Sequence, residues 1–308
     1  MIYSTVSDLS LFETLEQKLN ADVSVSLLAE LERELLRLRC ELDGDEWERF
    51  CKGFPKRSIY QVLRLGSLTL RRLTGAQFSF PADVLDIVMA DSFQARPSAA
   101  RSPSHLVSAW EYSLPAILSV RARKVHFSRE IAEVIRTVVK PRILILGAGQ
   151  MREAADSIYE THHKHAQFVA LEPDPASCER LRQTYRQGHL RLQKGNWNDL
   201  AGFVHHLESF DLIYSPSWLD STNDVQAISW LGSAVEMLRP GGRILAANFT
   251  PGSRDAGWIE ACWNWHPFYR SEEDLARLVM ELKHPEVRGH AMFRDESGAS
   301  VYLEIHSI

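Results

Sequence analysis

The stretch "ILILGAGQMREAADSIYE", residues 143–160, decides the fold. Its apolar start, from Ile143 to Leu146, fits a strand that is covered on both faces, as in a parallel sheet. Gly147 and Gly149 end this run, and the residues after them have a helical pattern. In an open parallel sheet a ligand lies beyond the carboxyl ends of the strands, where glycine lets the backbone approach it closely. The stretch therefore predicts an α/β fold with a nucleotide-like ligand at the turn, although a Gly-x-Gly alone also fits a tight structural turn.

Length and composition restrict the class of protein. The chain has 308 residues, 45% of them hydrophobic, which suits either one large domain with an appendage or two domains. Forty acidic and thirty-five basic side chains give a formal charge of −5, without a Lys/Arg block, so we expect no nucleic-acid partner. The composition does not indicate the oligomeric state.

Cysteine usage and hydropathy predict the compartment. Cys40, Cys51, Cys178 and Cys262 lie far apart without a CxxC pair, which favours free thiols in a reducing environment. No apolar stretch is long enough to span a bilayer, and the start "MIYSTVSDLS" lacks the features of a signal peptide. We therefore expect a cytoplasmic protein.

Up to about residue 140 the sequence gives helix signals. Leucines at three- and four-residue spacings in 26–42 predict an amphipathic helix, and 80–93 predicts a second one. Residues 96–105 have the composition of a connection, and the helical pattern of 106–139 is interrupted by Pro115, which predicts a kink or two helices. We predict a helical cap domain over residues 1–120.

After Pro141 strands and helices alternate. Strand patterns occur at "RILILG", "QFVALE", "LRLQKG", "FDLIYS" and "RILAANF", and the final "VRGHAMFRDESGASVYLEIHS" reads as two strands with a turn at 295–298. The prediction is a seven-stranded, doubly wound, Rossmann-like sheet with an antiparallel last strand, in a domain of residues 121–308.

Two further turns fit a nucleoside. Glu172 ends the second strand, about twenty residues after the glycines, where a carboxylate can accept hydrogen bonds from both ribose hydroxyls. Asn196 and Trp197 follow the third strand and offer an amide for an adenine edge and a ring for stacking. Glu172 as a solvated strand end and Trp197 as core are the alternatives. The absence of a third glycine, at Met151 or Arg152, disfavours NAD.

The motifs "ILILGAGQ", "ALEPDP", "KGNWND", "FDLIYSPSWLD" and "LRPGGRILAANF" together resemble those of class I S-adenosylmethionine-dependent methyltransferases, over roughly residues 121–308. The resemblance implies S-adenosylmethionine as cofactor, with the glycines beside its methionine part, Glu172 at its ribose and Ser215 at the catalytic face. By position, the residues that it places at the cofactor are Gly147, Ala148, Gly149, Glu172, Pro173, Asn196, Trp197, Tyr214 and Ser215. Gln150-Met151 departs from the usual glycine-containing loop, and Asn196 stands where an acid is common.

A narrower resemblance joins "GQMREAA" and residues 248–278 to a bacterial group that includes enzymes making 3-hydroxy fatty acid methyl esters. It implies functional roles for Trp265, Tyr269 and Arg270, although the helical N-terminal half departs from that group. A carboxylate acceptor is ionised at neutral pH and needs no base. Arg270, Arg123 or Arg152 can orient it, or each can be an ordinary ion-paired side chain.

Aromatic residues near the predicted ligand can line an apolar pocket, face a sulfonium or simply pack in the core. They are Trp218, Trp258, Trp263, Trp265, Phe268 and Tyr269. Tyr112 and His126 can reach the same site or pack between domains. His162, His163 and His165 lack a carboxylate or thiol partner in sequence, so we expect a solvated loop and no metal site.

Three functions follow from these motifs. The main hypothesis is methyl transfer from S-adenosylmethionine to a carboxylate or another small metabolite, giving S-adenosylhomocysteine. The layout also resembles nicotianamine synthases and azetidine-2-carboxylate synthases, which implies a cyclase that uses the cofactor as its sole substrate and releases methylthioadenosine. A non-catalytic cofactor-binding or interaction protein, in which the sheet serves as a scaffold, is the third.

Overall fold

The computed structural model describes residues 6–67, 69–70, 103–160, 166–185, 190–203 and 209–308. Its contacts divide the chain into two compact units, Met1–Leu118 with Gly252–His266 and Ser119–Pro251 with Pro267–Ile308. The predicted helix at 80–93, residues 96–102 of the predicted connection, and His162, His163 and His165 lie outside the described residues.

The second unit contains one seven-stranded sheet in the order β3-β2-β1-β4-β5-β7-β6. The first five strands pair in parallel, and β7 is antiparallel to both of its neighbours. This confirms the predicted doubly wound sheet with its antiparallel last strand. The strands are β1 Arg142–Leu146, β2 Gln167–Glu172, β3 Leu190–Lys194, β4 Phe210–Ser215, β5 Leu238–Phe249, β6 Val287–Arg294 and β7 Ser300–Ser307.

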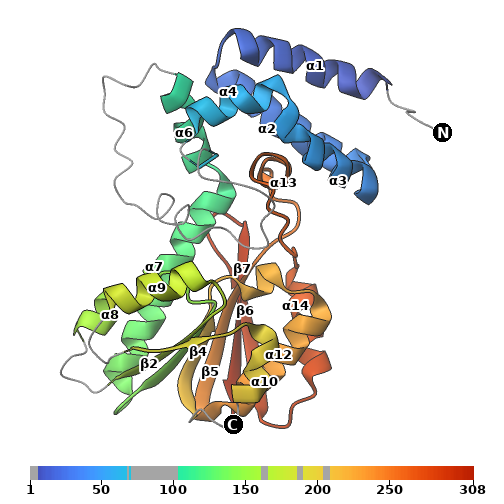
Figure 1. The fold of residues 1–308 in the computed structure, drawn as a ribbon. Helices are drawn as coiled ribbons and strands as arrows, with labels where there is room; N and C mark the ends of the chain where they lie inside the picture. The colour runs from blue at the N-terminus through green and yellow to red at the C-terminus, as the bar shows by residue number, and fades with distance from the viewer. Residues whose placement is uncertain (1–5, 68, 71–102, 161–165, 186–189, 204–208) are drawn as a thin grey trace. The chain divides into compact units, whose positions relative to one another are not determined.

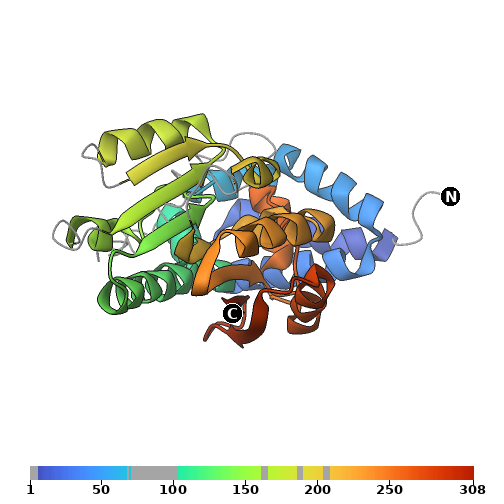
Figure 2. The same ribbon diagram turned by 90° about the horizontal axis from the view of Figure 1, so that it is seen from below.

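Helices cover both faces of this sheet (Figures 1 and 2). Alternate residues of β1 point to opposite faces: Ile143 and Ile145 pack in a cluster with α7, whereas Leu144 and Leu146 pack in a cluster with α12 and α14. All five β1 residues are buried, as the apolar run predicts. The helices of this unit are α7 Pro115–Thr137 (from Ser119), α8 Ala155–Glu160, α9 Pro175–Thr184, α10 Leu200–Phe203, α11 Trp218–Ser221, α12 Asp224–Glu236 and α14 Glu272–Leu282.

The first unit is helical. Its helices are α1 Val6–Ala21, α2 Val25–Glu41, α3 Gly44–Gly53, α4 Ser58–Gly66, α6 Pro103–Tyr112 and α13 Ala256–Trp263. The leucine pattern of 26–42 is α2, which Ser24 caps and which buries Leu31, Leu35 and Leu38. The helical pattern of 106–139 forms two helices, α6 and α7, that separate just before Pro115, as the proline predicts. Because proline is favoured in the first turn of a helix, α6 begins at Pro103, inside the predicted connection.

Residues 252–266 differ from the expected division, which placed them in the 121–308 domain. They pack with the helical unit because α13 buries all eight of its residues. Gly257 lies so close to the backbone of Leu35 in α2 that a Cβ atom would come within 2.5 Å of the Leu35 carbonyl carbon. Glu260 accepts hydrogen bonds from Trp47 (2.6 Å) and Arg39 (2.8 Å). The segment is therefore part of the helical core.

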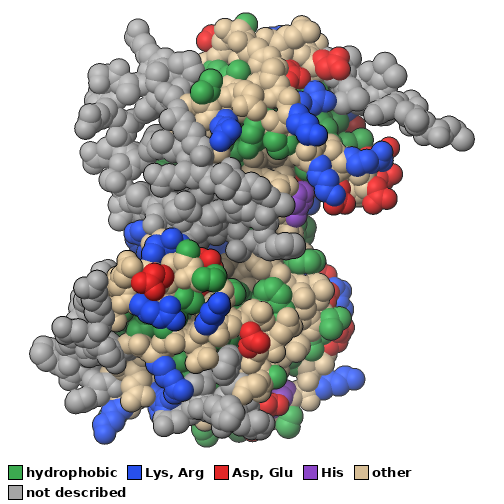
Figure 3. Space-filling model, in the orientation of Figure 1, with side chains coloured by type: hydrophobic (Ala, Val, Ile, Leu, Met, Phe, Trp, Pro, Cys, Tyr) green, Lys and Arg blue, Asp and Glu red, His purple; other side chains and the backbone are tan. Residues whose placement is uncertain are grey.

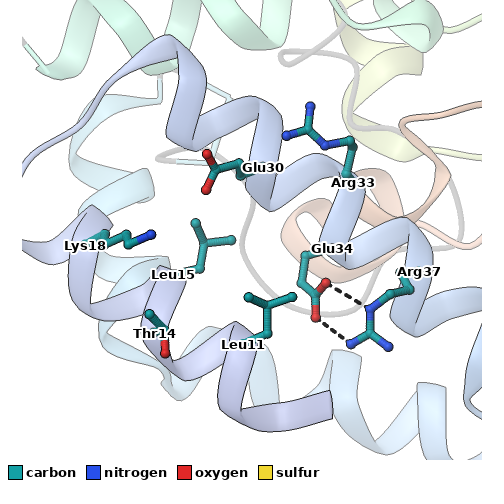
Figure 4. A pocket seen from close by; sticks show the side chains of 8 residues that line it. All are labelled: Leu11, Thr14, Leu15, Lys18, Glu30, Arg33, Glu34 and Arg37. Carbon is teal, nitrogen blue, oxygen red and sulfur yellow. Dashed lines mark hydrogen bonds and ion pairs between the residues drawn. The ribbon is translucent and has the colours of Figure 1, made fainter. Parts of the chain in front are cut away.

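A hollow of about 260 Å³ lies between α1 and α2 (Figure 4). Leu11 and Leu15 line it from α1, while Glu34 lines it from α2 and is paired with Arg37 at 2.6 Å.

Among the described helices, none is both long and apolar enough to cross a lipid bilayer.

Candidate functional site

The glycine loop after β1 has three residues in the left-handed backbone region. Gly147, Gly149 and Met151 have φ values of 70°, 54° and 51°. This conformation is unstrained for glycine but costs a non-glycine residue roughly 1–2 kcal/mol. Met151 offsets that cost by burying its side chain, which is 1% exposed. The loop thus adopts a glycine-like backbone at Met151, where the sequence departs from the usual pattern.

Glu172 connects the end of β2 to this loop. Its Oε2 accepts a hydrogen bond from the Gly149 amide (2.7 Å), and its Oε1 accepts one from the Asp174 amide (2.8 Å). The side chain is 4% exposed, and this burial raises the pKa of Glu172 although both amides favour the charged form. Glu172 is therefore a positioned carboxylate and not the solvated strand end of the alternative interpretation.

Trp218, at the start of α11, covers Gly147. A Cβ atom on Gly147 would lie 2.2 Å from Nε1 of Trp218, so only glycine fits beneath the indole. Trp218 also meets Trp197 and Trp230 edge to face, with ring centroids 6.2 and 6.0 Å apart. In contrast, the Cβ direction of Gly149 has no atom within 4 Å. The loop is therefore covered at its first glycine and open at its second.

Asn196 and Trp197 lie at the end of β3. The Asn196 side chain accepts a hydrogen bond from the Asn198 amide (2.8 Å), and the Asn196 amide donates one to the Asp199 carboxylate (2.8 Å). Asn196 thus caps the short 3₁₀ helix Trp197–Asp199, which uses its side-chain oxygen. Both Asn196 and Trp197 are half-buried.

Tyr214 and Ser215 point to opposite faces of the sheet. The Ser215 hydroxyl donates to the Leu146 carbonyl (3.0 Å) and accepts from the Trp218 amide (3.1 Å), so it holds α11 against β1. The Tyr214 hydroxyl donates to Glu153 (2.8 Å), and burial with the nearby Glu153 carboxyl raises the pKa of Tyr214 far above its ordinary value. The two side chains lie on different faces because strand residues alternate, and the contact of Tyr214 and Ser215 with the cofactor stays a prediction.

Arg270 does not have a free donor for an acceptor molecule. It is 2% exposed, and all five of its N–H groups have protein acceptors. These acceptors are the Asp224 carboxylate (3.0 and 2.9 Å), the Leu219 and Thr222 carbonyls (2.6 and 2.5 Å) and the Asn248 side chain (2.8 Å). Through these contacts Arg270 joins the segments around α11 and β5.

The guanidinium of Arg123, in α7, also donates all of its hydrogen bonds to acceptors within the protein. It contacts Ser300 (2.9 and 2.6 Å), the Pro216 carbonyl (2.7 Å) and the Asp220 carboxylate (2.5 and 3.4 Å). These contacts also use five donors, so the alternative interpretation of Arg123, an ion-paired side chain, is correct. Arg152 is exposed and donates to Gln150 (3.2 Å).

The remaining aromatic candidates are divided between the two units. Trp258 and Trp263 are fully buried in α13 and Trp265 is 5% exposed, all in the first unit. Tyr112 ends α6 in the same unit and is half-buried. In the second unit Phe268 is 46% exposed and Tyr269 is half-buried.

His126 lies beside the far edge strands of the sheet. Its ring meets Tyr302 of β7 and Phe293 of β6 with centroids 4.6 and 5.0 Å apart, and burial lowers its pKa. These strands are at the opposite edge from β2 and β3. The structure therefore brings Gly147, Gly149, Glu172, Ser215 and Trp218 together but places His126 elsewhere.

The sequence analysis did not predict the burial of two carboxyl groups, those of Asp220 and Glu111. Asp220 is 1% exposed and accepts from Arg123 and from the Phe249 amide (2.7 Å). Glu111, in the first unit, is 1% exposed and accepts from Trp263 (3.0 Å) and from Ser67. Neither has a sequence signal, because their partners come from distant parts of the chain. Within the described part of the chain, no group of His, Cys, Asp and Glu is arranged to hold a metal ion.

The sequence matches no family model and no curated protein, but solved structures are similar in fold. A "possible exported protein" from Bordetella parapertussis has a TM-score of 0.58 at 15% identity, over 91% of this chain and 94% of that chain. The CurJ carbon methyltransferase has a TM-score of 0.50 at 13% identity, over 92% of this chain and 97% of that chain. With the strand order and the antiparallel β7, this likeness shows that the chain has the fold of class I S-adenosylmethionine-dependent methyltransferases.

Proposed function

We propose that the protein binds S-adenosylmethionine at the carboxyl edge of its sheet and transfers the methyl group to a small-molecule acceptor, leaving S-adenosylhomocysteine. One observation carries the proposal: the buried Glu172 carboxylate is held beside Gly149, whose Cβ direction faces open space. A carboxylate and an uncovered glycine at the end of adjacent parallel strands are what a ribose and the groups next to it require.

The residues present fit this cofactor. Each Glu172 oxygen accepts one amide hydrogen bond and keeps a further lone pair for a ribose hydroxyl. Because Trp218 covers Gly147, the proposal places the methionine part closer to Gly149. Ala148, Pro173, Asn196 and Trp197 remain proposed contacts to the rest of the cofactor.

The chain's own part in the reaction is positioning and exclusion of water. The bound sulfonium supplies an activated methyl group, so the protein needs to align the acceptor nucleophile with it. Arg270 and Arg123 are fully bonded and are left out of this role. His126, beside β6 and β7, is left out as well. Tyr112, Trp265 and Tyr269 remain proposed acceptor contacts, and a carboxylate or another small metabolite is the proposed acceptor.

The cyclase is the second candidate, and the position of Trp218 favours it. An indole packed onto Gly147 reduces the space at the methionine end of the proposed site, and a bent methionine arm with no room for an outside acceptor is what ring closure needs. In that reaction S-adenosylmethionine is the sole substrate, and methylthioadenosine leaves with a cyclic amino acid.

Incubation with S-adenosylmethionine alone, followed by mass spectrometry, separates these candidates. Methyl transfer predicts no turnover until an acceptor is added, and then S-adenosylhomocysteine. Methylthioadenosine with a new cyclic amino acid from the cofactor alone identifies the cyclase. Calorimetry that detects binding of neither the cofactor nor S-adenosylhomocysteine overturns both and leaves the scaffold.

Variants of Glu172 test the site itself. Glu172→Gln keeps the shape of the side chain but removes its charge, and we expect about 10- to 100-fold weaker cofactor binding, because a hydrogen bond to a charged group contributes roughly 1.5–3 kcal/mol. Glu179→Gln, on the exposed side of α9 beside Arg182, is the matched control. Equal affinities of the Glu172 variant and wild type would contradict the ribose assignment.

The proposed partners are small molecules and the proposed compartment is the cytoplasm. All four cysteines are free thiols, three of them buried, which suits a reducing environment. The surface drawn in Figure 3 has acidic and basic side chains interspersed over much of the described chain, which does not favour a nucleic-acid partner.

A further inference from the structure

A second hollow lies beside the end of the glycine loop. It has a volume of about 200 Å³. One wall is formed by the end of the glycine loop and the start of α8, and the other by the last turns of α9. Gln150 and Arg152 line it on the loop side, and Arg180, Leu181 and Tyr185 line it on the α9 side. None of these residues was predicted to contact the cofactor. Arg152 was predicted only as one of three arginines that can orient an acceptor.

The walls of this α8–α9 hollow are fixed by packing and hydrogen bonds. Leu181 is 1% exposed and belongs to the cluster that covers this face of the sheet. The Tyr185 hydroxyl donates to the carbonyl of Met151 (3.3 Å), which ties the end of α9 to the glycine loop. The hollow is therefore part of the fold and does not depend on surface side chains alone.

The hollow is basic. Arg152 and Arg180 approach it from two different elements, and no acidic residue is among the described residues that line it. Arg180 forms an ion pair with Asp174 at 3.9 Å, and the Asp174 carboxylate also caps α9 by accepting from the Ala176 and Ser177 amides.

Arg180 has an unused buried donor. Its Nη2 donates to the Ser177 hydroxyl (3.3 Å), but its Nε is buried and has no hydrogen-bond partner in the part of the chain that the structure describes. Buried donors in native proteins are nearly always paired with protein, water or ligand. An acceptor beside Arg180 would satisfy this donor.

We propose that the α8–α9 hollow binds the phosphate group of a small phosphorylated molecule. Two guanidinium groups from separate elements suit a doubly charged, tetrahedral anion, whereas a single planar carboxylate is satisfied by one guanidinium. Gln150, whose side-chain oxygen accepts from Arg152 (3.2 Å), lines the same hollow. This site is independent of the proposed function.

Calorimetric titration of the full chain with ribose 5-phosphate and with inorganic phosphate, at constant ionic strength and without S-adenosylmethionine, tests the proposal. We expect saturable binding of ribose 5-phosphate that weakens at least tenfold in Arg180→Gln and in Arg152→Gln. Tighter binding of the ester than of inorganic phosphate identifies a phosphorylated metabolite, and equal binding identifies the free ion as ligand. Thermal melting confirms that each variant is folded.

Arg182→Gln is the matched control, because Arg182 is an exposed arginine of α9 that pairs with Glu179 at 3.8 Å and does not line the hollow. Its affinity for both probes should equal that of wild type. Absence of saturable binding of both probes, or an equal loss in Arg182→Gln, overturns the proposal, since the latter indicates general attraction of anions to a basic surface.

Discussion

Gly147 and Gly149 share a left-handed backbone conformation but have different surroundings. We expect Gly147→Ala to lower the free energy of unfolding by more than Gly149→Ala does. Both variants incur the left-handed strain of roughly 1–2 kcal/mol, but at Gly147 the new methyl group also displaces Trp218, and such overpacking typically costs about 1–3 kcal/mol more. Urea denaturation of the two variants measures the difference, and equal losses would show that Trp218 moves away freely.

Individual site residues differ in how far the sequence predicts them. Glu172 and the glycines follow from spacing along one βα unit, because neighbouring parallel strands end at the same edge. Arg270 could not be assigned in this way, since its donors are used by the carbonyls of Leu219 and Thr222, which only the folded chain brings to it. The alternation of a strand does predict that Tyr214 and Ser215 diverge.

At the scale of elements, α13 depends on close backbone packing. We expect Gly257→Ala to lower the free energy of unfolding by about 1–3 kcal/mol, the usual cost of overpacking, because its Cβ would lie 2.5 Å from a backbone atom of α2 that cannot rotate away. Gly44→Ala, at a helical glycine with no atom in its Cβ direction, is the control and should be neutral or stabilising. Denaturant titration compares them, and a neutral Gly257→Ala would refute the close packing of α13 on α2.

The sheet was predictable because each strand is an apolar run bounded by a turn, with a helical pattern after it. The assignment of 252–266 to the helical unit was not predictable from its neighbours in sequence. Its composition gave one usable signal: "AGWIEACW" is apolar on nearly all sides, which is typical of a helix buried all round. What that helix packs against is a long-range property that no local pattern contains.

At the scale of the whole molecule, burial of carboxyl groups makes stability depend on pH. Burial raises the pKa of Glu111 from 4.5 to about 7, so the folded state binds a proton more tightly than the unfolded state does. Stability from this group is therefore present below pH 4.5, falls as the pH rises through 7, and is lost above it. The difference amounts to about 3 kcal/mol.

Glu111→Gln tests this pH dependence. The amide can accept from Trp263 and donate to Ser67 without titrating, so the decrease in unfolding free energy between pH 5 and pH 8 should be smaller than in wild type. Denaturant titrations at several pH values measure it, with the exposed Glu133→Gln of α7 as control. Parallel wild-type and Glu111→Gln profiles would contradict a raised pKa at Glu111.

The position of α13 in the sequence also has a consequence for folding during synthesis. The helices from α1 to α6 leave the ribosome first, but Glu111 and Trp47 acquire their partners Trp263 and Glu260 only after most of the chain has been made. Domains usually fold as units from the N-terminus during translation. Here the N-terminal helices can complete their core only after strands β1 to β5 of the sheet unit have been translated, so the first unit to emerge waits for a segment that follows most of the second unit.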